Sequence, residues 1–214
     1  FAACMAAGGI RREVQVTALP EGRTLPGVDI TRFVDGPAEM IGIVVNPSRG
    51  TTGVGEERKI DLNSFDKSTR IVVDMPCDGH LYDTRTGKYH GWGRTLRDRF
   101  DPMNARLYTI VPYRVLNLGA KVIGKASPGV ACKVSVSIEA EGSLSGSRHV
   151  VRCDVYDPKG RWLHYYCRNL LVSDGLGEFS IPLAESDPTG RWTIRLRDCV
   201  TGVRGESAIS VRKG

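Results

Sequence analysis

The sequence lacks a long hydrophobic run and any block of clustered basic residues. No stretch of about 18 apolar residues occurs among its 214 residues, so no membrane-spanning helix is expected. The formal net charge is +6, but Lys and Arg are spread along the whole length. A nucleic-acid-binding face needs these residues clustered. We therefore expect neither a membrane nor a nucleic acid as a partner.

The sequence also lacks the cysteine and histidine spacings that are typical of metal sites. No CxxC pair occurs, and no histidine stands at ligand spacing from another. No metal and no other cofactor is therefore predicted. Free buried thiols are one interpretation of the cysteines, and a disulfide between two of Cys153, Cys167 and Cys199 is the alternative. The six cysteines are Cys4, Cys77, Cys132, Cys153, Cys167 and Cys199, and the four histidines are His80, His90, His149 and His164.

Catalytic motifs are missing as well. Glycoside hydrolysis needs two carboxylates that face each other about 5–10 Å apart. Asp83, Asp157 and Asp187 instead fall in turns, where aspartate commonly hydrogen-bonds to the backbone. The glycine- and serine-rich segment 142–146 is not a serine-hydrolase elbow and predicts a flexible hairpin loop, and segment 50–55 lacks the ending of a phosphate-binding loop. We predict a chain that is not an enzyme, with an independent hydrolase as a less favoured alternative.

What the sequence does contain is alternation of apolar and polar residues, interrupted by turn residues every 8–12 positions or so. This pattern predicts an all-β chain of two consecutive antiparallel β-sandwich domains, at residues 14–117 and 118–214. About seven strands in about 95 residues make the second domain immunoglobulin-like in size. Residues 1–13 are expected to be the tail of an upstream domain, a helical stub that stops at Gly8 and Gly9. The predicted strands are 14–18, 29–34, 40–45, 58–62, 70–75, 80–83, 106–111, 131–140, 150–156, 162–167, 170–172, 178–181, 192–197 and 207–211.

Several strand-and-turn motifs resemble a known architecture. The segments GVDITRF (27–33), HLYDTRTGKY (80–89) and VPY (111–113) resemble the β-sandwich that follows the catalytic barrel and the glutamine-amidotransferase-like domain in large bacterial β-galactosidase-like proteins. The segments VYDPKG (155–160), RN (168–169) and TGRWTIRLRD (189–198) resemble the C-terminal immunoglobulin-like module of those proteins, and the last of them also resembles macroglobulin-type sandwich domains.

The resemblance implies a non-catalytic accessory role within a larger glycoside-hydrolase-like protein. The catalytic carboxylates of the family would lie in the upstream barrel, so none is assigned to this chain. The expected partners are that catalytic barrel and the α/β domain that precedes this region in the parent protein. Another copy of the chain or a polysaccharide is a further possible partner. The resemblance also implies a secreted or periplasmic location.

One cluster predicts a ligand site. Tyr89, His90, Trp92 and Arg94 combine aromatic rings with polar groups, and glycines flank Trp92. Asp83 and Gly87 in the bend of segment 82–89 predict a β-hairpin that leads into this cluster. Exposed Trp and Tyr rings stack on sugar faces in carbohydrate-binding modules, so the alternative function is carbohydrate binding at this hairpin. The competing interpretation is that Trp92 is an ordinary core residue. Trp162 and Trp192 stand in alternating segments and are predicted to be core.

Overall fold

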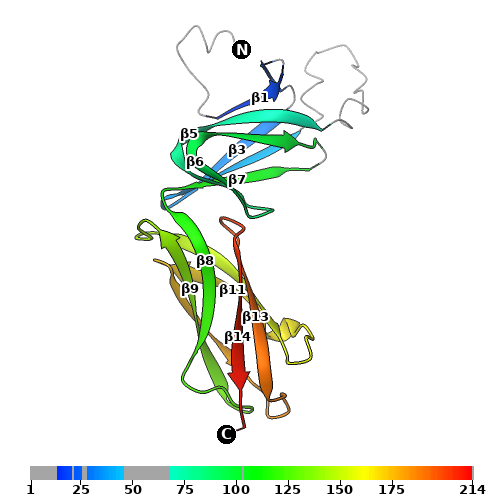
Figure 1. Cartoon of the computed structure of the whole chain (residues 1–214), viewed down its shortest axis with the longest axis vertical. Coiled ribbons are helices and arrows are strands. Elements are labelled where there is room, and N and C mark those ends of the chain that lie inside the picture. Colours follow the sequence, from blue (N-terminus) through cyan, green and yellow to red (C-terminus); the bar gives the residue numbers. More distant parts are fainter. Residues whose placement is uncertain (1–13, 21, 26–27, 46–67, 103, 214) are drawn as a thin grey trace, which may run out of the picture.

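The chain forms two β-sheets that are stacked end to end (Figure 1). The structure is a computed structural model that describes residues 14–20, 22–25, 28–45, 68–102 and 104–213. Within these ranges every regular element is a strand except the short 3-10 helix η3 at His164–Tyr166. The predicted all-β chain with two sheets is thereby confirmed. The predicted helical stub at 1–13, the strand at 58–62 and the loop at 50–55 lie outside the described residues.

The first sheet has the strand order β2-β1-β5-β7-β4-β3, and β6 pairs with β5. Strand β5 pairs with β1 through its first half and with β7 through its second half, while β6 pairs with both halves. A register shift between Asp74 and Gly79 separates the halves, so the β5–β6 hairpin passes from one layer of a sandwich to the other. The strands are β1 (Gln15–Leu19), β2 (Arg23–Thr24), β3 (Val28–Asp35), β4 (Ala38–Val45), β5 (Thr69–Asp83), β6 (Lys88–Phe100) and β7 (Arg106–Val111).

The second sheet has the strand order β14-β13-β10-β11-β12-β9-β8. Strands β11 and β12 share only the pair Ser173–Leu176, so the sheet folds there into two layers. The outer strands β14 and β8 then lie side by side. The strands are β8 (Arg114–Ile123), β9 (Ala131–Glu141), β10 (Arg148–Tyr156), β11 (Arg168–Ser173), β12 (Leu176–Pro182), β13 (Gly190–Asp198) and β14 (Arg204–Val211).

The change from one sheet to the other falls between Val111, the end of β7, and Arg114, the start of β8. Residues 114–117 thus pair with β9 of the second sheet. The division of the chain at residue 117 and the immunoglobulin-like classification of the second domain stay predictions from the sequence.

Each sheet encloses its own hydrophobic core. The first core contains Ile41, Ile71 and Tyr108, each inaccessible to solvent. The second core is built on Trp192 and Ile194, and it reaches into the first sheet through Tyr82. Alternating inward residues on both sides of each sandwich produce these cores, as the sequence pattern predicts.

Four local predictions are wrong. The segment 162–167 contains an isolated bridge from Trp162 to Tyr156 and the 3-10 helix rather than a strand. Trp162 is 53% exposed, so its prediction as a core residue is wrong, whereas Trp192 is fully buried as predicted. The loop at 142–146 joins β9 and β10, which do not pair with each other, so it is a connection between layers and not a hairpin. Predicted strands 70–75 and 80–83 are one strand, β5.

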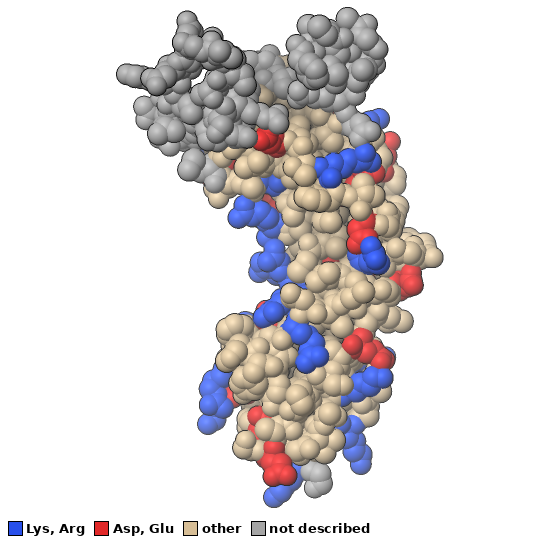
Figure 2. All heavy atoms as spheres, turned by 180° about the vertical axis from the view of Figure 1, so that it is seen from behind, with Lys and Arg blue, Asp and Glu red and all other residues tan. Residues whose placement is uncertain are grey.

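Basic side chains are scattered along the face drawn in Figure 2 and do not gather into one large patch. Acidic side chains lie among them on the same face. No helix in the described part of the chain is long and apolar enough to cross a membrane.

Candidate functional site

The indole of Trp92 projects from the β5–β6 hairpin into solvent. Its exposed fraction is 62%, so the interpretation of this residue as core is wrong. Gly91 and Gly93 on either side have φ angles of 99° and 146°, a backbone conformation that other residues rarely adopt. The flanking glycines thus give β6 an unusual backbone conformation at the point where the exposed ring leaves the sheet.

A line of aromatic rings leads from Trp92 back to the interior. His80 lies opposite Trp92 in the β5–β6 register, and the two rings meet edge to face with centroids 4.8 Å apart. The Nδ1 atom of His80 is 2.8 Å from the hydroxyl oxygen of Tyr89. The Tyr89 ring in turn lies 5.2 Å from the buried Tyr82 ring. The exposed indole is thus connected by ring contacts to the buried Tyr82.

Charge is present beside these rings. The guanidinium carbon of Arg114 lies 4.8 Å from the centroid of the Tyr89 ring, in a cation–π arrangement. Arg114 also pairs with Glu141 at 3.9 Å. Burial, and to a lesser degree the positive charge of Arg114, lower the pKa of His80, although Glu141 opposes the shift. At neutral pH the His80 ring is therefore uncharged and offers one donor and one acceptor nitrogen.

The structure does not bring all four predicted site residues together. His90 occupies the extra position of a β-bulge, between the pairs Leu81–Gly91 and Tyr82–Tyr89. Its ring lies 6.2 Å from the buried Tyr108 ring, and its Nε2 atom is buried without a hydrogen-bond partner among the described residues. Burial is the main reason why the pKa of His90 is lowered. His90 therefore faces the first core.

Arg94 is occupied in holding the hairpin together. One of its guanidinium nitrogens, Nη2, donates to the carbonyl oxygens of Met75 and Pro76 at 3.1 and 3.3 Å. These carbonyls belong to the irregular part of β5, so Arg94 satisfies backbone groups that the interrupted ladder leaves free. Of the four predicted residues, Trp92 and Tyr89 thus remain together, and both contact His80, which the sequence did not single out.

The second notable site is the buried junction between the sheets. The hydroxyl groups of Thr84 and Thr109 lie 2.9 and 2.6 Å from the carbonyl oxygen of Val200, and 2.7 Å from each other. Two hydroxyl protons thus serve three short contacts. Thr84 and Thr109 belong to the first domain and Val200 to the β13–β14 loop, so these bonds join the two domains.

Two loops also meet at this junction with almost no space between them. A Cβ atom added to Gly202 would lie 2.3 Å from the carbonyl oxygen of Thr84, and one added to Gly87 would lie 2.5 Å from the carbonyl oxygen of Gly202. Both glycines have positive φ angles. A side chain at either position would push the β5–β6 turn away from the β13–β14 loop.

The β13–β14 loop is shaped by a buried carboxylate. Asp198 accepts hydrogen bonds from the amides of Val200 and Thr201, each at 3.0 Å, and from the Thr201 hydroxyl. Its Oδ2 atom also lies 3.0 Å from Nδ1 of His149, whose Nε2 is 2.8 Å from the Tyr113 hydroxyl. Burial alone would raise the pKa of Asp198, but the bonds from His149, Thr201 and Val200 together outweigh it and lower that pKa. Burial raises the pKa of Tyr113 to about 12.

The three turn aspartates serve the backbone, as predicted. Asp83 accepts from the amide of Arg85 at 2.9 Å, Asp157 from the amide of Lys159 at 2.9 Å, and Asp187 from the amide of Ala184 at 2.8 Å. Among the described residues no group of three or more His, Cys, Asp or Glu side chains could hold a metal ion. The five described cysteines are unpaired.

Comparison with known proteins adds little to this geometry. No family model matches the sequence, and no curated protein matches it. Among solved structures, an alpha-2-macroglobulin from Salmonella is 13% identical with a TM-score of 0.37, over 89% of this chain and 13% of its own. A transglutaminase from red sea bream is 10% identical with a TM-score of 0.29, over 100% of this chain and 33% of its own. The chain therefore spans a third or less of either neighbour, and likenesses this weak carry no functional argument.

Proposed function

We propose that this chain is a non-catalytic accessory module of a larger glycoside-hydrolase-like protein, in which it holds two β-sandwiches in a fixed relation. The observation that carries the proposal is the pair of hydroxyl contacts from Thr84 and Thr109 to the Val200 carbonyl. All three residues are buried. Breaking the hydrogen bonds of buried polar groups costs free energy. A change in the angle between the two sheets would break these bonds and is therefore opposed.

Further contacts support a rigid junction. The Tyr82 hydroxyl accepts from the Val115 amide at 2.9 Å, and one guanidinium nitrogen of Arg197 donates to the carbonyl oxygen of Thr84 at 3.3 Å. At the periphery the Nε atom of Arg148 donates to Asp35 at 2.9 Å. A spacer that presents neighbouring domains at a set distance needs stiffness of this kind. The partners of the proposal are the upstream barrel and α/β domain of the parent protein.

The surface offers places for such partners. Phe33 and Val34 of strand β3 are 53% and 60% exposed, and β3 is the last strand of its sheet in the described part of the chain. An exposed apolar strand edge is favourable for contact with another domain or another copy of the chain.

The experiment is NMR relaxation of the 214-residue chain. Equal rotational correlation times for amides of the two sheets, matching one elongated body, are expected. Independent and shorter times for each sheet would overturn the rigid-spacer proposal. Hydrolysis of a glycoside by the purified chain, lost on substitution of a carboxylate, would overturn its non-catalytic part and favour the hydrolase alternative.

The second candidate function is carbohydrate binding at the hairpin, and the exposure of Trp92 favours it. The indole face is free to stack on a sugar ring, and the His80 imidazole and Tyr89 hydroxyl can hydrogen-bond to sugar hydroxyls beside it. The test is affinity electrophoresis of wild type, Trp92→Ala and Trp162→Ala against a polysaccharide panel. Trp162 is the matched control because it is also exposed.

Retardation that disappears only in Trp92→Ala would support this second function. Retardation lost equally in both variants, or retained in Trp92→Ala, would remove the hairpin as the site. If no polysaccharide retards the wild type, carbohydrate binding is removed and the spacer proposal remains as the single candidate function.

A further inference from the structure

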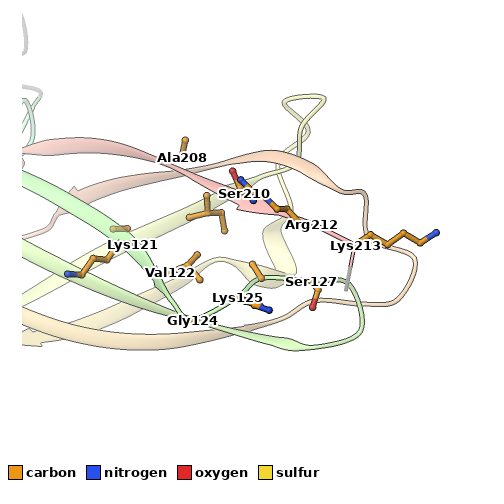
Figure 3. Close-up of a pocket in the computed structure, with 12 residues that line it drawn as sticks. Lys121, Val122, Gly124, Lys125, Ser127, Ala208, Ser210, Arg212 and Lys213 are labelled. Atoms are coloured by element: carbon orange, nitrogen blue, oxygen red, sulfur yellow. The ribbon is translucent and has the colours of Figure 1, made fainter.

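A groove of about 570 Å³ lies at the far end of the second domain, away from the junction (Figure 3). It lies between β8 and β14, the two outer strands of the second sheet. Hydrogen bonds join the two walls of the groove. The amide of Ala120 donates to the Ser207 hydroxyl at 2.8 Å, and the amide of Arg212 donates to the Ala126 carbonyl at 2.9 Å. These bonds hold the two walls of the groove at a fixed separation.

The floor of the groove is apolar. Val122 is half-buried, and Ala126 and Ile209 are buried, with exposed fractions of 6% and 3% for the last two. The volume lies within the range of about 300–1,000 Å³ that is usual for small-molecule sites. Such sites combine an apolar lining with a few polar groups that fix the orientation of the ligand.

The rim of the groove is positively charged. Lys121, Lys125, Arg212 and Lys213 line it, and Figure 3 shows Lys121 and Lys213 at opposite ends. None of the twelve lining residues is acidic. Within the described residues none of these four side chains forms an ion pair, although exposed cations elsewhere, such as Lys133 and Arg195, do. Charges of one sign around a cavity attract ligands of the opposite sign.

We propose that this groove binds an amphipathic anion of small-molecule size, with an apolar body on the Val122–Ile209 floor and a carboxylate, sulfate or phosphate head on the basic rim. The four cations stay solvated without a ligand, and an anion placed among them gains charge-assisted hydrogen bonds. The hydroxyls of Ser127 and Ser210 also line the groove and add neutral donors. The proposal is independent of the accessory function and of the Trp92 hairpin.

The test uses the fluorescent anion anilinonaphthalene sulfonate and its uncharged analogue N-phenylnaphthylamine as probes of the full chain. We expect saturable binding of the anion with one site per chain, and affinity that falls as salt is added because added ions screen the rim. The uncharged analogue should bind at least tenfold more weakly. A short alkyl carboxylate should displace the fluorescent anion, and the corresponding alcohol should not.

Two variants locate the site. The double variant Lys125→Glu/Arg212→Glu reverses charge on the rim at exposed positions, and Val122→Trp enlarges a side chain of the groove floor with the charge unchanged. Each should weaken anion binding at least tenfold. The control Arg97→Glu/Lys159→Glu makes the same change in net charge at exposed cations outside the groove and should leave binding unchanged.

Several outcomes would overturn the proposal. They are the absence of saturable anion binding, equal weakening by the control and the rim variants, and full binding by Val122→Trp. Because Lys125 and Arg212 are exposed and Val122 is half-buried at the surface of the groove, the variants are expected to fold, and an unchanged melting temperature of each variant verifies this.

Discussion

The hydroxyl group of Tyr82, in the first sheet, accepts a hydrogen bond from the backbone amide of Val115, in the second, at 2.9 Å. Tyr82 is almost fully buried and its ring belongs to the core of the second domain. Burial raises the pKa of Tyr82 to about 12, so the phenol stays protonated over the physiological range. One side chain thus contributes to both the packing and the hydrogen bonding of the junction.

Tyr82→Phe is expected to destabilise the chain by about 1–3 kcal/mol, since the buried Val115 amide loses its acceptor while the ring contacts remain. Urea unfolding followed by tryptophan fluorescence measures the loss. Tyr165→Phe is the matched control because Tyr165 is 58% exposed, and it should change stability by less than about 0.5 kcal/mol. Equal effects of the two substitutions would show that the Tyr82 hydroxyl contributes nothing specific.

The two threonines at the junction should be energetically coupled. In Thr84→Val or Thr109→Val the Val200 carbonyl keeps one hydroxyl donor, so each single variant should lose about 1 kcal/mol. In the double variant that buried carbonyl has neither donor, and the loss should exceed the sum of the single losses by about 1 kcal/mol. Unfolding free energies of the four proteins measure the coupling. Additivity within a few tenths of a kcal/mol would contradict it.

Regular alternation made much of the fold predictable. In 192–197 the sequence predicts that Trp192, Ile194 and Leu196 point inward, and they are 0%, 0% and 2% exposed. The β5–β6 hairpin was equally clear from its aspartate and glycine. These predictions succeed because side chains on a strand alternate between two faces, so a half-buried strand carries its own pattern.

Where the strand breaks its own pattern, the prediction fails. No strand is predicted over residues 114–123, where the structure has β8. Leu116 is 48% exposed and Leu118 is buried although they are two residues apart, because a register shift between Val115 and Asn117 interrupts the alternation. Pro76 and Gly79 look like turn residues, but they lie in the bulge of one continuous strand, β5. A sequence window does not show whether such residues end a strand or bend it.

The candidate site was half predictable for a similar reason. Glycines beside Trp92 indicate exposure of its ring, and the ring is exposed. The contact with His80 depends on the pairing register of two strands, and the bulge that turns His90 inward shifts that register. Register is a property of the folded hairpin, so the local sequence did not distinguish His80 from His90.

The tryptophans outside the hairpin should differ sharply in their effect on stability. Trp192→Ala is expected to cost about 3–5 kcal/mol because the ring is fully buried and its Nε1 donates to the Pro188 carbonyl at 2.9 Å. Trp162→Ala removes an exposed ring with one hydrogen bond to Asp154 at 3.3 Å and should cost less than about 1 kcal/mol. Thermal and urea unfolding measure both. Similar losses would contradict the burial difference.

The buried Asp198 should make the stability of the second domain depend on pH. Its pKa is lowered in the folded chain, so it binds a proton more readily when unfolded. Its contribution to stability is therefore complete above the unfolded value of about 3.9 and is lost as the pH falls through the folded value. Asp198→Asn leaves the bonds to His149 and Thr201 imperfect and should cost about 3 kcal/mol at pH 7.

The difference between wild type and Asp198→Asn should then narrow as the pH is lowered below about 4, because wild type alone loses this contribution. Urea midpoints measured across a series of pH values test this, with Asp78→Asn as the control at an exposed carboxylate. A constant difference at every pH would show that Asp198 acts only through the shape of the β13–β14 loop. A stability difference that narrows with acid would instead show that the negative charge of Asp198 stabilises the β13–β14 loop and, with it, the junction contacts of Val200.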